Sequence, residues 1–92
     1  MFTLIRPQLA QHDSGYFVTT RDRHSVLLME ADGSSVVAEA EYGPRDSVYT
    51  STIVKHDAQG RTLAMSDAER DSAAERMAEG LRAMGATVDV YW

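Results

Sequence analysis

The chain is 92 residues long, 43% hydrophobic and 25% charged, which is close to the globular average and argues against a disordered or membrane-embedded chain. This length fills one hydrophobic core, so we expect a single domain spanning residues 1–92; the absence of cysteine excludes disulfides, thiolate metal sites and a cysteine nucleophile. A formal net charge of −5 repels nucleic acid at long range, so direct nucleic-acid binding is not expected.

The first part of the chain reads as short strands separated by turns. Residues 2–6 predict a strand that Pro7 ends, because proline lacks the amide hydrogen that a sheet ladder requires. A polar connection containing residues 12–15 then leads to an alternating strand over residues 16–21. A charged turn follows at residues 21–24.

The middle of the chain continues the β pattern. Residues 26–29 are all apolar, which predicts a central strand covered on both faces. Asp32 and Gly33 tolerate positive φ and predict a hairpin turn. The strand after that turn alternates most clearly, and its inward-facing set is expected to be Val36, Ala38, Ala40 and Tyr42.

Two further segments complete the predicted sheet. Residues 48–55 are rich in β-branched and aromatic residues and predict a strand, which a turn at residues 57–60 joins to residues 61–65 as a hairpin. Residues 86–92 alternate again and predict a final strand, with Trp92 as a large apolar anchor.

The segment between Ser66 and Gly85 predicts a helix with both ends marked. Ser66 and Glu69 fit a capping box, and Gly85 is a typical C-terminal stop. Gly80 lies inside the helix, where either a neighbouring strand approaches closely or the position is unoptimised. An apolar stripe at spacings of three and four should face a sheet: Ala73, Ala74, Met77, Ala78, Leu81 and Met84.

Together these elements predict an α+β fold. We expect an antiparallel sheet of six to seven strands, one helix over about residues 66–84 packed on one face, and a C-terminal strand. The N-terminal segment lacks the basic start and cleavage site of a secretory signal, and a cysteine-free chain fits a reducing compartment, so a cytoplasmic location is expected.

Two charged surfaces are candidate binding sites. The first is an acidic row at a spacing of four, Asp67, Asp71, Glu75 and Glu79, which would line up along about 18 Å of helix. Because like charges at this spacing are unfavourable, the row suggests a basic protein partner, with a plain solvated face as the alternative. The second is a basic tip, Arg21, Arg23 and His24, which could contact phosphate or simply keep strand ends soluble.

No catalytic, cofactor or metal motif stands out in the sequence. Ser14 lies two residues from His12, but a Ser-Gly pair is ordinary turn chemistry. His12, His24 and His56 lack the spacing of a zinc helix, and no glycine-rich phosphate loop occurs. We therefore expect no cofactor, and a small enzyme with histidines converging in a pocket between helix and sheet is the competing class of function.

The hairpin over residues 57–65, followed directly by Ser66-Asp67-Ala68-Glu69-Arg70, resembles a pattern in small orphan proteins of phages and prophages. In that group an aspartate and glycine hairpin leads into a capped, acidic helix, and the resemblance covers residues 48–81. It implies an accessory role carried out by binding, as in the small acidic anti-CRISPR proteins, which block host machinery by occupying charged surfaces. It transfers no functional residue.

The function predicted from the sequence is a non-enzymatic protein-binding module, an accessory protein or inhibitor that acts through the acidic helix face or a sheet edge. A homodimeric structural protein joined along a sheet edge is a third alternative, because an antiparallel sheet leaves two edges that another strand can pair with.

Overall fold

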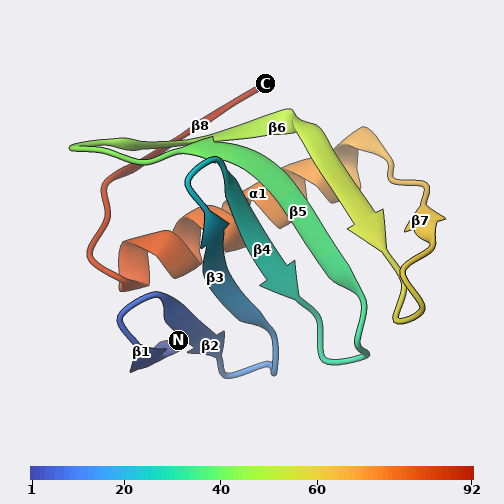
Figure 1. Ribbon diagram of the computed structural model, residues 1–92, viewed down its shortest axis with the longest axis horizontal. Helices are drawn as coiled ribbons and strands as arrows, with labels where there is room; N and C mark the ends of the chain where they lie inside the picture. The colour runs from blue at the N-terminus through green and yellow to red at the C-terminus, as the bar shows by residue number, and fades with distance from the viewer.

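Eight strands form one sheet around a single helix in the computed structural model, which describes all residues 1–92 (Figure 1). Seven strands follow one another in chain order, each antiparallel to the next, and the eighth is parallel to the sixth. The elements are β1 (Phe2–Arg6), β2 (Leu9–His12), β3 (Phe17–Asp22), β4 (Ser25–Met29), β5 (Ser35–Glu41), β6 (Asp46–His56), β7 (Thr62–Leu63), α1 (Asp67–Ala83) and β8 (Val88–Tyr91).

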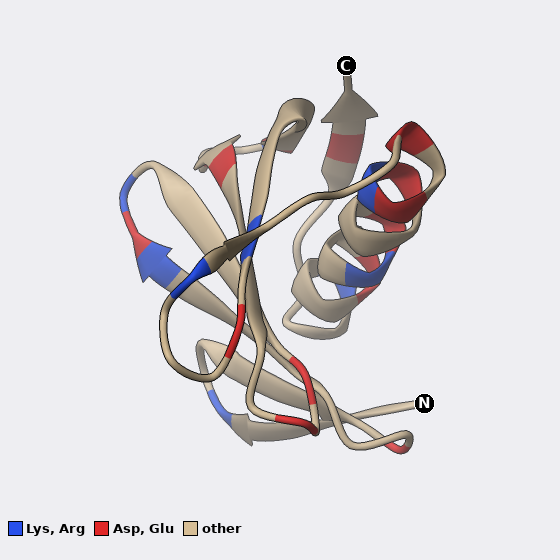
Figure 2. Ribbon diagram, turned by 90° about the vertical axis from the view of Figure 1, so that its right-hand side faces the viewer, with Lys and Arg blue, Asp and Glu red and all other residues tan.

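The α+β class, the single helix and its packing on one face of the sheet are confirmed. Two details of the predicted sheet were wrong, because the sheet has eight strands and its last strand is parallel rather than antiparallel. The sheet also curls around α1 as a half-barrel (Figure 2), which brings β1 and β8 toward the two sides of the helix.

Strand β2 is the strand that the sequence pattern missed. It has only two apolar residues, Leu9 and Ala10, and it ends in the polar segment that predicted a connection. Its place is fixed by its neighbours, because Ala10 pairs with Leu4 on one side and with Val18 on the other. A strand of four residues with only two apolar ones is too short to show an alternating pattern, so the sequence alone did not reveal it.

One row of side chains crosses the inner face of the sheet in register. Val18, Leu28 and Val36 form its centre and are fully buried or nearly so. The apolar stripe of α1 packs over this row, and its members Ala73, Ala74, Met77, Ala78 and Leu81 are buried. Three members of the inward set predicted for β5, Val36, Ala38 and Ala40, are at most 2% exposed, and the fourth, Tyr42, follows the strand and is partly buried.

Gly80 is the point of closest approach between α1 and the sheet. A Cβ atom built on Gly80 would lie 2.5 Å from the Cβ of Val18 on β3. The close-approach interpretation of this glycine is therefore correct.

Strand β6 carries a large bulge that bends it. Between Val37 and Glu39, a single residue of β5 lies opposite residues 50–53 of β6. The Thr52 hydroxyl accepts a hydrogen bond from the Glu39 amide at 2.8 Å and donates to the Tyr49 carbonyl at 2.6 Å. The bend lets one part of β6 pair with β8 and the other with β7.

Two expectations about burial are wrong. Strand β4 is central, but only its inner face is covered, and Met29 on its outer face is 42% exposed. Trp92 is 60% exposed and therefore is not a buried anchor, while the neighbouring Tyr91 stacks on Tyr49 with ring centroids 6.0 Å apart. α1 is the only helix, and it is not long and apolar enough to cross a membrane.

Candidate functional site

The acidic row lies along the exposed side of α1. The capping box is present, since the Ser66 hydroxyl accepts from the Glu69 amide and the Glu69 carboxylate accepts from the Ser66 amide, each at 3.1 Å. Because the apolar stripe faces the sheet, the opposite side of the helix faces solvent. All four predicted acids are exposed there: Asp67, Asp71, Glu75 and Glu79.

The arginines of α1 leave most of this row uncompensated. Arg70 lies 3.4 Å from Asp67, but Arg76 pairs with Glu30 beyond the end of β4, and Arg82 donates to the Val88 carbonyl at 3.0 Å. As a result Asp71, Glu75 and Glu79 make no ion pair. The electrostatic potential at the solvent side of the acidic row is therefore strongly negative.

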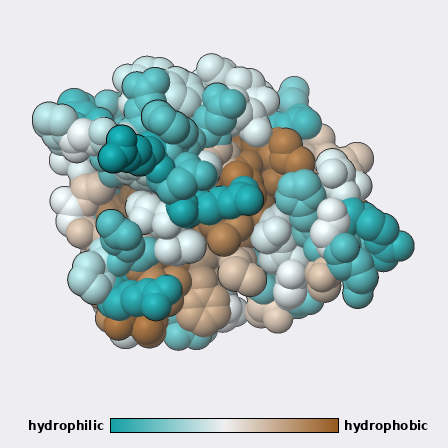
Figure 3. Space-filling view, in the orientation of Figure 1, coloured by the Kyte–Doolittle hydropathy of each residue, from teal (hydrophilic) through white to brown (hydrophobic).

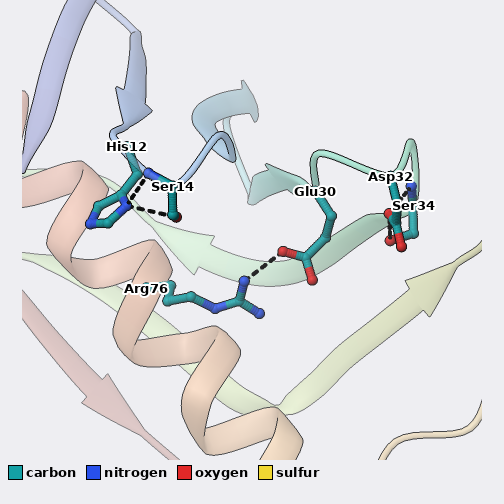
Figure 4. A network of polar contacts seen from close by, with 6 residues as sticks. All are labelled: His12, Ser14, Glu30, Asp32, Ser34 and Arg76. Atoms are coloured by element: carbon teal, nitrogen blue, oxygen red, sulfur yellow. Dashed lines mark hydrogen bonds and ion pairs between the residues drawn. The ribbon is translucent and has the colours of Figure 1, made fainter.

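Arg76 is held in place by more than its ion pair. Figure 4 shows its ion pair with Glu30. The guanidinium carbon also lies 5.2 Å from the centre of the Tyr16 ring, so a cation–π contact adds to this bond. Burial, reinforced by the negative charge of Glu79, raises the pKa of the Tyr16 phenol. These contacts direct the arginine toward the sheet.

The basic tip is formed as predicted but is partly neutralised. Arg21, Arg23 and His24 are exposed at the turn between β3 and β4. Asp22 lies between them, and hydrogen bonds from the His24 amide and from Ser25 lower the pKa of its carboxyl group. Arg45 does not join this tip, because it makes a bidentate ion pair with Asp89 of β8.

A hollow of about 500 Å³ adjoins the tip. The residues that line it are Gln8, Thr20, Arg21, Asp22, Arg23, Tyr42, Gly43 and Asp46. Because the two arginines lie beside two carboxylates, the hollow is no clear anion site. Tyr42 donates a hydrogen bond to the Ser25 carbonyl at 2.7 Å, and its burial raises the pKa of the phenol to about 12.

His12 and Ser14 contact each other, as their spacing allows. The Nδ1 atom of His12 lies 2.8 Å from the Ser14 hydroxyl and accepts a hydrogen bond from the Ser14 amide at 3.1 Å (Figure 4). The His12 ring also stacks on Tyr16 at 4.7 Å. The contact closes the exposed turn between β2 and β3, and no hollow adjoins it.

The three histidines do not come together. His24 and His56 line separate hollows, and no hollow is lined by two histidines. No group of three potential metal-ligating side chains occurs either. A hollow of about 310 Å³ does lie between α1 and the sheet, where Lys55 and Arg76 face it beside the carboxylates of Glu30 and Glu69.

The sequence pattern missed a second surface, on the sheet face opposite α1. Five residues from five adjacent strands lie in register there and form what we call the outer band: Leu9, Thr19, Leu27, Val37 and Val54. No element covers this face, and Figure 3 shows hydrophobic side chains gathered over the central strands. The uninterrupted apolar run of β4 was the available signal, since it places Leu27 and Met29 on the second face.

The sheet edges are the remaining candidate surfaces. β1 exposes Leu4 and Ile5, which are 49% and 51% accessible, and β8 exposes Tyr91 at the other edge.

No protein-family model, characterised protein or solved structure matches the chain. The kinship with phage accessory proteins and the cytoplasmic location therefore stay predictions.

Proposed function

We propose that the chain is a protein-binding module that recognises a basic partner surface through the acidic row of α1. The observation that carries this proposal is the diversion of Arg76 and Arg82 toward the sheet, which leaves Asp71, Glu75 and Glu79 without an ion pair. Repulsion among these carboxylates is unfavourable in the free chain and would be relieved by a cationic partner.

The partner class follows from the geometry of the row. Carboxylates four residues apart on a helix repeat about every 6 Å along its axis, so the best match is a surface with lysines or arginines at a similar spacing. A second helix with basic residues at every fourth position is the simplest such surface. An accessory protein or inhibitor that occupies a charged surface of its target would use this row.

The test is binding to a defined probe, a 16-residue helical peptide with arginine at every fourth position, measured by fluorescence anisotropy. Reversing two charges with Glu75→Lys and Glu79→Lys should weaken binding about tenfold or more, because like charges then face each other. The matched control reverses two exposed acids outside the helix, Asp13→Lys and Glu41→Lys. This control should weaken binding of the peptide much less. Equal losses in both variants would reject a local recognition surface.

The hollow between α1 and the sheet supports a second candidate, a small-ligand site. Lys55 points from the inner face of β6 toward this hollow and makes no ion pair. The lining carries two cations and two carboxylates, however, so its charges largely cancel. The acidic row, which has no such compensation, favours the protein-binding proposal.

A further inference from the structure

The outer band is the centre of a larger uncovered surface. On one side of it lie Phe17 and Met29, which pair with each other across β3 and β4. On the other side Ser25 pairs with Glu39, and Arg21 lines the same hollow as both of them. The face therefore has an apolar middle. Arg21 on β3 and Glu39 on β5 place opposite charges on the two sides of β4.

The hollow in this face is lined by one residue of each charge. It measures about 370 Å³ and lies where the bulge of β6 opens the sheet. Arg21 and Glu39 both line it, and neither makes an ion pair within the chain. Opposite charges left free on one apolar face are suited to pairing across an interface.

We propose that this face binds a second copy of the chain around a two-fold axis that runs along β4. Such an interface brings the same patch of both copies together, so each contact occurs twice. With the axis on β4, β3 of one copy lies opposite β5 of the other, and β2 lies opposite β6. Leu27 then meets Leu27, while Thr19 faces Val37 and Leu9 faces Val54 of the second copy.

The charges of the face fit the same symmetry. Arg21 on β3 faces Glu39 on β5 of the second copy, twice per dimer. Two residues that lack an ion pair within one chain are thereby paired across the axis. A partner of unrelated sequence would have to supply both charges at matching positions independently.

The curl of the sheet limits the strength of this contact. Two outer faces that curve away from each other touch mainly through β3, β4 and β5, so the interface is smaller than the usual size of about 800 Å² per partner. We expect a dissociation constant on the order of 10–100 μM. The acidic rows of the two copies stay free on the far sides of the dimer.

Sedimentation velocity at chain concentrations from about 1 μM to 1 mM tests the proposal. It is measured for the wild type and for two variants, each with a charge at one apolar position. Leu27→Asp places a charge at the centre of the outer band and should raise the dissociation constant at least tenfold. Ile5→Asp is the matched control, since Ile5 lies on the exposed edge strand β1, and it should leave the dissociation constant unchanged. A wild-type chain that stays monomeric at 1 mM, or a loss confined to Ile5→Asp, would overturn the proposal.

A charge exchange tests the symmetry itself. Arg21→Glu alone and Glu39→Arg alone should each abolish the dimer up to 1 mM, because two like-charge pairs form in each homodimer. An equimolar mixture of these two variants should restore it, since every pair is then of opposite charge. Circular dichroism checks that both variants fold. A mixture that remains monomeric would reject this arrangement, whatever the wild type does.

Discussion

A missing side chain sets the distance between α1 and the sheet. Gly80 costs the helix about 1 kcal/mol relative to alanine, so its presence in an otherwise well-formed helix needs a reason. Val18 provides it, because its branched side chain on β3 fills the space that a Cβ atom would enter. The sequence alone left two explanations open, because it does not show which strand lies beneath the helix.

Replacing Gly80 with alanine should therefore destabilise the protein. The gain in helix propensity is about 1 kcal/mol, but overpacking in a tight core costs about 1–3 kcal/mol, and the Cβ of Val18 cannot rotate away. We expect a net loss of up to about 2 kcal/mol in the free energy of unfolding measured in urea. In a Val18→Gly background, which removes that Cβ atom, the same change should be neutral or stabilising. An increase in stability of the wild type would contradict the close approach.

The elements that the sequence predicted well are those specified by neighbouring residues. The helix is one, because its cap, its apolar stripe and its terminal glycine all lie within residues 66–85. The bulge of β6 and the strand β2 are different, since each is visible only in the register with the neighbouring strands and has no marker in its own residues. The acidic row could be predicted because it needs only the helical repeat, whereas the outer band requires the register of five strands.

The start of α1 offers a test of this local specification. Ser66→Ala removes the hydroxyl that accepts from the Glu69 amide, and loss of such a cap costs about 1 kcal/mol. Ser72→Ala is the control, because Ser72 is an exposed serine inside the same helix, where alanine is the better helix former. Thermal unfolding should show a lower midpoint for Ser66→Ala and an equal or higher one for Ser72→Ala. Equal losses would mean that the capping box does not hold the helix.

At the scale of the whole molecule, the helix and the outer band lie on opposite sides of one curled sheet. The chain closes this arrangement by returning from α1 to the edge of the sheet, where β8 pairs with β6. Besides the Arg82 and Tyr91 contacts described above, two polar contacts beyond that ladder hold the returning segment. The Asp46 amide donates to the Thr87 carbonyl at 2.7 Å, and Arg45 binds Asp89 through two hydrogen bonds of 2.9 and 2.8 Å.

The pair of Arg45 and Asp89 should make the attachment of β8 depend on pH. Hydrogen bonds and charge from Arg45 lower the pKa of the Asp89 carboxyl below its ordinary 3.8. A carboxyl group with a lowered pKa stabilises the folded state above that ordinary value, and the contribution is lost as the pH falls through the lower folded value. Protection of the β8 amides from hydrogen exchange should accordingly fall below about pH 4.

Arg45→Met should lower this protection at neutral pH and weaken its dependence on pH below 4, because Asp89 then loses the main partner that favours its charged form and keeps only the weaker effect of Arg82. Arg61→Met is the control, since Arg61 is similarly exposed but pairs with Asp57 inside its own hairpin. Because exposed pairs contribute little to global stability, the effect should appear in β8 rather than in β3 or β4. Unchanged protection of β8 in Arg45→Met would show that the ladder with β6 alone holds the last strand.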